Sequence, residues 1–163
     1  MLEIRRYPDP VLTQKCSLVC EVDDSIRRLM DTMFKVMEQS MGQGLAAPQI
    51  GVLQRVIVMK VDDIYYALAN PRILNPRGKV KDEEGCLSIP GVKVEVPRAA
   101  SLKVEGLDLD GDSLTLDAKG DLARVIQHEV NHIDGKLIID YLPKAERLNF
   151  DLNYLEAMEQ TAP

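Results

Sequence analysis

Apolar residues recur every three or four positions near the start of the chain, over residues 24–41. This spacing places them on one side of an α-helix, which Asp24 or Ser25 can cap. Its many methionines indicate core packing, because a flexible thioether fills irregular gaps. Gly42 is expected to end the helix, since glycine readily takes the left-handed conformation. The apolar positions are Ile26, Leu29, Met30, Met33, Phe34, Met37 and Met41.

The middle of the chain changes to short runs rich in β-branched and aromatic residues. Residues 55–60 and 64–68 flank a two-residue acidic turn and predict a β-hairpin. The pairs Asn70-Pro71 and Asn75-Pro76 are expected to break the chain after the hairpin. Further strands are predicted at residues 92–96, 102–107 and 114–116.

Helical spacing returns in the last third of the chain. A second helix is predicted from near residue 121 through about residue 132, closed by Gly135, and a third from after Pro143 to about residue 159. A short extended segment is expected between them, at 137–140. The pattern predicts an α+β fold, with antiparallel β-sheets around a central helix and a helix at each end. Residues 1–163 are expected to form one domain, which is long enough to bury a core.

Composition and charge exclude some classes of protein. The chain is 45% hydrophobic and 28% charged, as globular proteins are. Its net charge of −6 argues against a nucleic-acid binder that relies on bulk positive charge, but leaves room for docking on a large assembly through a local patch. No apolar run is long enough to span a bilayer, and the N-terminus lacks the apolar stretch of a signal peptide, so a cytoplasmic protein is expected.

The strongest chemical signal is the pattern H-E-x-x-H on the second predicted helix, from His128 to His132. Residues four apart lie on one face of a helix, so both imidazoles can reach one metal ion. Glu129 is placed next to the first ligand, where it can act as a general base. The alternative is two surface histidines on an amphipathic helix. The chain has only two histidines and both fall in this pattern, which favours the metal site.

A catalytic metal site needs a third protein ligand and an open position. Cys86 is the candidate, expected in a loop between Gly85 and Pro90, because a thiolate binds iron or zinc strongly. The plainer interpretation is a small buried hydrophobic residue, which is how we interpret Cys16 and Cys20. Three cysteines cannot all pair within the chain, so free or metal-bound thiols are expected.

Small residues are concentrated in a third segment, Gly42-Gln43-Gly44-Leu45-Ala46-Ala47-Pro48-Gln49-Ile50-Gly51. They allow close backbone approach, which suits either tight packing or contact with a peptide. Gln49 can donate an N–H to a developing oxyanion. A helix end followed by a tight loop explains most of this segment equally well.

Taken together, G-x-G-L-A-A-P-Q, E-G-C-L-S and Q-H-E-x-x-H resemble the three signature motifs of the peptide deformylases, in order and in separation. The likeness extends from Pro8 to Tyr141. It implies hydrolysis of the formyl group from the N-terminal formylmethionine of newly synthesised polypeptides, which are the expected partners. It also leaves room for transient contact with the ribosome.

The resemblance assigns roles to individual residues. The metal ligands map onto Cys86, His128 and His132, and the general base maps onto Glu129. The metal is a divalent ion, Fe²⁺ in the cell, which Zn²⁺, Ni²⁺ or Co²⁺ can replace. The oxyanion donors map onto the Gln49 side chain and the Leu87 backbone N–H. Substrate-binding backbone maps onto Gln43, Gly44 and Gly85.

Two positions depart from the family pattern. Asn131 stands where an acid often precedes the second histidine, so Arg98 is expected to lose a charged partner. Gln43 stands where an apolar residue is usual, which affects the expected preference for substrate side chains and not the reaction. The C-terminal tail is net acidic, which predicts little ribosome affinity, and its apolar residues are expected to pack on the domain. These residues are Leu148, Phe150, Leu152, Leu155 and Met158.

Two other functions remain open at this point. A zincin-type metallopeptidase would need a third ligand from His or Glu downstream, but no histidine remains. A non-catalytic, metal-stapled binding protein would have no need of Glu129 or Gln49.

Overall fold

The computed structural model describes residues 2–161 and has the expected α+β architecture. The helices are α1 (Asp24–Gln39), α2 (Gly120–Ile133) and α3 (Lys144–Thr161), with short 3₁₀ segments at η1 (Pro10–Thr13), η2 (Ala47–Ile50) and η3 (Ile138–Tyr141). The strands are β1 (Gly44–Ala46), β2 (Val56–Val61), β3 (Ile64–Arg77), β4 (Val80–Cys86), β5 (Ile89–Arg98), β6 (Ser101–Leu107) and β7 (Ser113–Lys119).

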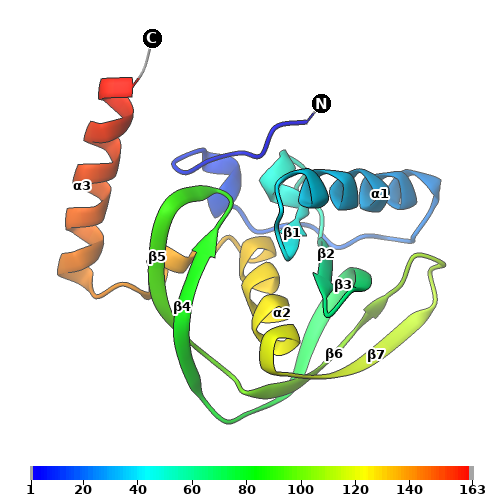
Figure 1. Ribbon diagram of the computed structural model, residues 1–163. Coiled ribbons are helices and arrows are strands. Elements are labelled where there is room, and N and C mark those ends of the chain that lie inside the picture. The colour runs from blue at the N-terminus through cyan, green and yellow to red at the C-terminus, as the bar shows by residue number, and fades with distance from the viewer. Residues whose placement is uncertain (1, 162–163) are drawn as a thin grey trace.

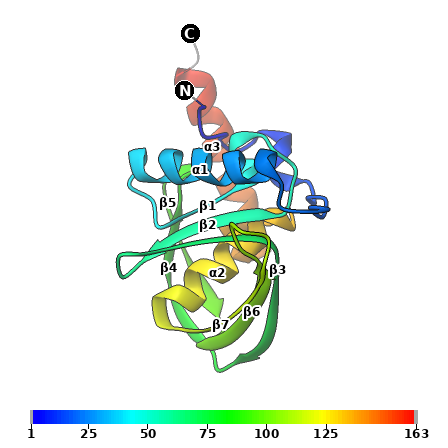
Figure 2. The ribbon, with the colours of Figure 1, turned by 90° about the vertical axis from the view of Figure 1, so that its right-hand side faces the viewer.

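Two antiparallel sheets enclose the central helix. Five strands form one sheet in the order β1-β2-β3-β6-β7, and β4 and β5 form a separate hairpin. Helix α2 lies between this sheet and the hairpin, as Figures 1 and 2 show. Helix α1 covers the opposite face of the sheet, over β1 and β2.

Helices α1 and α2 each bury the apolar side that their sequence patterns predict. On α2, the fully buried Ile126 and Ile133 join Ile57, Leu68 and Val104 of the sheet in one cluster. On α1, the side chains of Met30, Met33 and Met37 have no exposed surface and pack against the other face of the sheet, which confirms the prediction of core packing for these three. The prediction is wrong for Met41, which lies beyond the end of the helix and is 93% exposed. Burying one such side chain stabilises the fold by about 1.5–3 kcal/mol.

The predicted chain breaks after the hairpin are wrong. Strand β3 continues through both Asn-Pro pairs to Arg77, and its pairing with β6 shifts register around each of them. Asn70 and Asn75 take left-handed conformations, with φ of 53° and 50°. Proline removes a backbone donor, so these positions become bulges in a continuous strand. The Asn70 side chain is also used here, since it hydrogen-bonds both the N–H and the C=O of Val19 at 2.8 Å.

Three further local predictions are corrected. The left-handed residue after α1 is Met41 (φ 54°) and not Gly42, whose N–H instead donates to the Met37 carbonyl at 3.0 Å. The segment expected to be extended at 137–140 forms the 3₁₀ turn η3, because the Asp140 carboxylate accepts the Leu137 N–H at 2.8 Å. Cys16 is buried as expected, whereas Cys20 is exposed.

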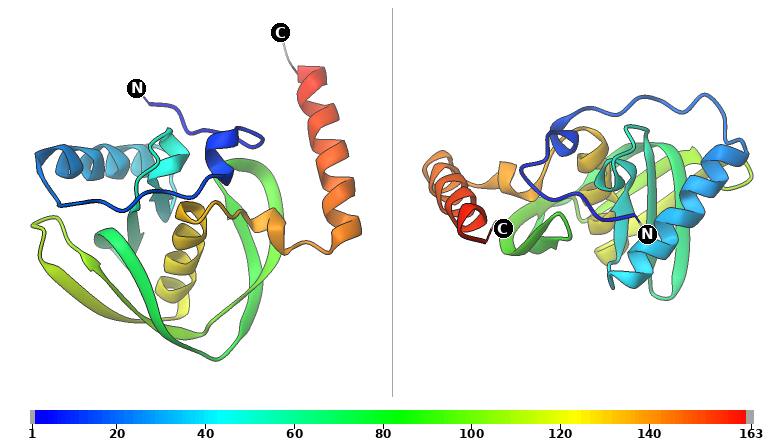
Figure 3. Two further views of the ribbon diagram at one scale, coloured as in Figure 1. Left: turned by 180° about the vertical axis from the view of Figure 1, so that it is seen from behind. Right: turned by 90° about the horizontal axis from the view of Figure 1, so that it is seen from above.

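Helix α3 extends away from the rest of the domain (Figure 3). One side of it packs on Tyr7 through Phe150 and Tyr154, with ring centroids 6.1 and 5.6 Å from that of Tyr7. The expectation that the other apolar residues of the tail pack on the domain is wrong. Leu148, Leu152, Leu155 and Met158 are 61, 60, 42 and 41% exposed. No helix within residues 2–161 is both long and apolar enough to cross a membrane.

Candidate metal and catalytic site

Both histidines lie on the same face of α2. The spacing of four residues brings their rings one above the other, with centroids 5.0 Å apart. The helix presents this face toward the β4–β5 hairpin. The geometry is therefore the one that the H-E-x-x-H pattern predicts for two ligands of one ion.

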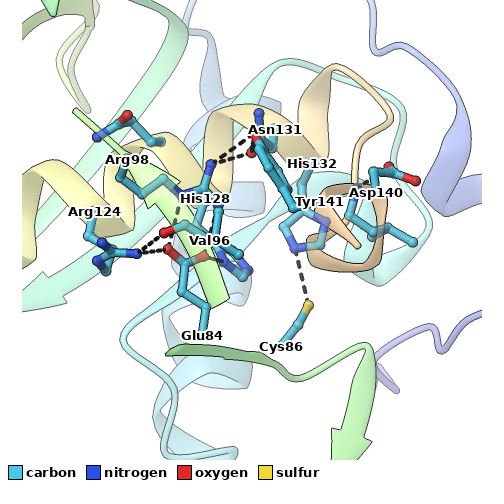
Figure 4. Close-up of polar contacts among 12 residues, drawn as sticks. Glu84, Cys86, Val96, Arg98, Arg124, His128, Asn131, His132, Asp140 and Tyr141 are labelled. Atoms are coloured by element: carbon cyan, nitrogen blue, oxygen red, sulfur yellow. Dashed lines mark hydrogen bonds and ion pairs between the residues drawn. The ribbon is translucent and has the colours of Figure 1, made fainter. Parts of the chain in front are cut away.

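Cys86 lies close enough to both histidines to be a third ligand, although its surroundings differ from the prediction. It is the last residue of β4, not part of a loop, and it pairs with Ile89 across a tight two-residue turn. Its Sγ lies 3.3 Å from Nε2 of His132 (Figure 4). One ligand atom from each of Cys86, His128 and His132 lies within 4.8 Å of the others, close enough for all three to bind one ion.

Glu84 orients the first histidine. Its carboxylate lies 2.9 Å from Nδ1 of His128, which leaves Nε2 for the metal. Arg98 donates to both carboxylate oxygens at 2.8 and 2.9 Å, and Arg124 donates to one of them. Burial alone would raise the pKa of Glu84, but the hydrogen bonds with Arg98 and His128 lower it to about 2. Glu84 is thus a carboxylate at neutral pH and holds the ring in place.

Arg98 contacts residue 131 as expected, through a neutral amide in place of an acid, and it keeps a second partner that is charged. Asn131 accepts a hydrogen bond from Arg98 through its amide oxygen, and Tyr141 donates to the same oxygen at 3.0 Å. The charge of Arg98 is balanced by Glu84 on strand β4. The substitution of an acid by asparagine therefore removes one ionic contact and leaves the network connected.

Glu129 has the environment of a general base. It is only 4% exposed, and its Oε1 is one of two buried side-chain nitrogen or oxygen atoms in residues 2–161 without a protein partner. The other is Nδ1 of His132. Burial raises the pKa of Glu129 to about 7, while the charges of His128 and Arg98 act in the opposite direction. A base with a pKa near the working pH transfers protons efficiently in both directions.

The donor set fits a divalent transition metal. One thiolate and two imidazoles suit zinc, iron, nickel or cobalt, and three protein ligands leave a position open for water and substrate. Burial lowers the pKa of His132 well below its usual value, so its ring is neutral and able to bind a metal. Glu129, with its unpartnered oxygen, follows His128 directly on the same helix.

Gln49 is fixed beside the ligands by its own amide. Its Oε1 accepts the Ala46 N–H at 2.9 Å, and its Nε2 donates to Ser88 Oγ at 3.1 Å and lies 3.9 Å from Cys86 Sγ. Leu87 follows Cys86 in the turn between β4 and β5. The structure thus places both residues that are expected to donate to an oxyanion next to Cys86.

A cleft of about 1680 Å³ opens at this site. Gln43, Gly44, Gly85, His128 and Glu129 are all among its lining residues. Strand β1 is an edge strand of the large sheet, and within residues 2–161 β4 has β5 as its single partner. Backbone groups on two strands therefore border the cleft, where an extended peptide can be added as a further strand.

Three residues that build this site have no role in the sequence interpretation. Glu84 appears there only as part of the E-G-C-L-S motif, and neither Ser88 nor Arg124 is assigned a contact. Arg124 precedes His128 by four residues, so helical spacing already placed it beside the first ligand. Nothing in the sequence indicated that Glu84 would meet both arginines.

Replacing Gly44 by alanine is expected to disable Glu129. A Cβ at this position would lie 2.5 Å from Glu129 Oε2, closer than real contacts allow, so the carboxylate must move. A misplacement of about 1 Å can cost roughly 100-fold in turnover. We expect Gly44→Ala to retain its metal and lose activity by this factor or more, as measured by metal content and product release.

Gly85→Ala serves as the comparison. Its Cβ would meet mainly the flexible end of Lys93, at 2.9 Å, which can move aside. Its loss should be much smaller. Equal losses in the two variants would show that the clash with Glu129 is not the cause.

The comparisons with known proteins agree with this geometry. The family model for polypeptide deformylase matches residues 1–148. A peptide deformylase of Hydrogenovibrio crunogenus is 42% identical over 164 residues, covering 99% of this chain and 97% of that protein.

Solved structures give the same result. A peptide deformylase from Ehrlichia chaffeensis in complex with actinonin has a TM-score of 0.91 and 38% identity, over 99% of both chains. The enzyme from Thermus thermophilus has a TM-score of 0.89 and 41% identity, over 98% of this chain and 96% of that one. Neither a zincin-type metallopeptidase nor a binding protein is supported by these matches. The chain belongs to the peptide deformylase family of metal-dependent hydrolases.

Proposed function

We propose that the chain removes the formyl group from the N-terminal formylmethionine of newly synthesised polypeptides and releases formate. The observation that carries this proposal is the buried, unpartnered Glu129 carboxylate beside a Cys86, His128 and His132 ligand set. Family membership selects formamide hydrolysis among the reactions that such a site can catalyse. Residues 1–163 act as one catalytic domain in this proposal.

The site residues divide into ligands, base, oxyanion donors and substrate-binding backbone. A divalent metal held by Cys86, His128 and His132 supplies Lewis-acid activation of the attacking water and the formyl carbonyl. The borders of the cleft at Gln43, Gly44 and Gly85 hold the peptide in extended form. Gln43 brings an amide to this border, so the substrate side-chain preference of this chain is expected to differ from that of relatives with an apolar residue.

The proposed chemistry begins with proton transfer to Glu129. Glu129 accepts a proton from the water that attacks the formyl carbon. The amide of Gln49 and the N–H of Leu87 donate to the oxyanion that forms, and one such donor contributes about 3 kcal/mol. Glu129 then donates its proton to the leaving nitrogen, the C–N bond breaks, and formate and a free α-amino group result.

Fe²⁺ is the metal that we propose for the cell. Ferrous iron beside a thiolate is exposed to oxygen, and both the iron and the Cys86 sulfur can be oxidised. We expect iron-loaded protein to lose activity in air and to keep it under argon, whereas nickel- or cobalt-loaded protein should stay active in both. Zinc-loaded protein should be stable but slow. Formate release from a formyl-Met peptide, followed over time for each metal form, tests both the activity and the metal.

The same measurement includes outcomes that contradict the proposal. Equal decay of the iron and nickel forms, with Cys86 unmodified by mass spectrometry, would exclude oxygen chemistry at this site. Absence of formate from every metal form would contradict the deformylase assignment itself.

Partners and location follow from the substrate. Formylmethionyl nascent chains are the proposed partners, and the cytoplasm is the proposed location. Direct nucleic-acid binding is not expected at a net charge of −6. Any contact with the ribosome would be transient and would use a local patch other than the acidic tail.

A further inference from the structure

The outward face of α3 carries an exposed stripe of three leucines. Leu148, Leu152 and Leu155 are spaced by four and three residues, so they lie in line along one side of the helix. The side that packs on the domain carries Phe150 and Tyr154 instead. Figures 1 and 3 show α3 at the margin of the molecule, away from the five-stranded sheet. The stripe is therefore open to a partner.

The charge of α3 limits what that partner can be. The helix carries two basic residues, Lys144 and Arg147, against four acidic ones. An acidic helix is repelled by phosphate groups, so neither RNA nor an anionic membrane fits it. A partner surface must be apolar where it covers the leucines, and it must carry charges opposite to those that flank them. The four acidic residues are Glu146, Asp151, Glu156 and Glu159.

The stripe and its flanking charges match those of a second, antiparallel copy of the same helix. Lys144 precedes the leucines by four residues, and Glu159 follows them by four. Along the helix, the pair Lys144 and Glu159 and the pair Leu148 and Leu155 share one centre, which lies next to Leu152. An antiparallel copy would thus place leucine against leucine in the centre and lysine against glutamate at both ends.

We propose that α3 binds α3 of a second copy of this chain in an antiparallel pair. Leu152 packs on Leu152 of the second copy near the two-fold axis, and Leu148 packs on Leu155 of that copy. Lys144 pairs with Glu159 of the second copy, once at each end. A two-fold contact of this kind uses the same surface twice and closes at a dimer.

The proposed dimer is weak and leaves the catalytic cleft open. Stable interfaces bury about 1,200 Å² or more, and one pair of helices of this length buries less, so association should depend on concentration. No residue of α3 is among those that line the cleft within the described chain. Dimer formation is therefore independent of formamide hydrolysis.

Sedimentation velocity of the full-length, metal-loaded protein tests the proposal, over about 5 to 500 µM. The parent should shift from monomer to dimer as its concentration rises. Leu152→Glu should remain monomeric throughout, because two carboxylates would meet at the axis. The matched control is Leu18→Glu, at a leucine that is 70% exposed outside α3, which should dimerise like the parent. All three should keep the same circular dichroism and the same activity when dilute.

Charge exchange tests the antiparallel register. Lys144→Glu should weaken the dimer several-fold, since it opposes Glu159 at both ends, and the double variant Lys144→Glu with Glu159→Lys should restore it. Three results would overturn the proposal: a parent that stays monomeric, a Leu152→Glu variant that dimerises normally, or a double variant no better than the single one. Ribosome binding that requires the same leucines would assign the stripe to another partner and would also overturn it.

Discussion

Glu129→Gln should retain its metal and lose nearly all turnover. Glu129 is not among the ligands, so the group of Cys86, His128 and His132 survives the change. The amide has nearly the shape of the carboxylate but cannot accept the proton of the attacking water. General base catalysis contributes about 10²- to 10⁴-fold, and we expect a loss of that size in kcat. Metal analysis and formate release on one sample measure both parts.

The unusual burial of this carboxylate sharpens the expectation. Burial raises the pKa of Glu129 to about 7, because a buried carboxylate loses its hydration and this costs folding free energy. Glutamine carries no charge and avoids this cost. The variant should therefore fold at least as stably as the parent, which separates loss of the base from loss of structure. A variant that stays active, or one that is isolated without metal, would defeat the assignment of Glu129.

Cys86→Ala should lose the metal. The sulfur is the one ligand that comes from the β4–β5 hairpin, whereas both imidazoles come from α2. Two imidazoles alone hold a divalent ion much more weakly than two imidazoles with a thiolate. Losing a residue that only hydrogen-bonds a ligand lowers metal affinity by about 10- to 100-fold, so we expect the loss of a ligand to lower it by more than about 100-fold. Titration with a competing chelator gives the affinity, and activity should fall with occupancy.

Cys16→Ala is the matched control for this change. Cys16 is buried in the core, outside the ligand group, and burial raises the pKa of its thiol to about 11. Its replacement should leave metal affinity unchanged. If Cys86→Ala bound metal as tightly as the parent, the proposed ligand set would be wrong.

The sequence predicted the parts of the fold that depend on local periodicity. Both helices with a clear apolar side, α1 and α2, form within a few residues of the expected bounds, because each buries a side that only a helix can align. Strand β3 was cut short because proline and asparagine indicate turns locally. Pairing with β6 absorbs both Asn-Pro pairs as bulges, and no local pattern contains that information.

Helix α3 shows the opposite limitation. Its existence was predicted, but its leucines were expected to pack on the domain, and three of them face outward instead. The spacing of the leucines predicts an apolar stripe on the helix, but it does not indicate which surface, if any, covers that stripe. Apolar residues at helical spacing predict a buried face only when a partner surface lies within reach.

For the site, the sequence placed the ligands better than the groups that support them. The i, i+4 spacing of His128 and His132 is local, and the motif combination added Cys86. The contacts of Glu84 with Arg98 and Arg124 join three separate elements, β4, β5 and α2, so they could only be seen in the fold. The position of Gly44 against Glu129 is likewise a tertiary contact.

The most direct test of the central claim is the product analysis of one reaction. Nickel-loaded protein is incubated with a formyl-Met peptide that contains several internal peptide bonds, and formate, new α-amino groups and peptide fragments are measured together. We predict formate and α-amino groups in equal amounts, with the peptide chain intact. Internal fragments without formate, or no reaction while the three ligands hold a metal ion, would contradict the account.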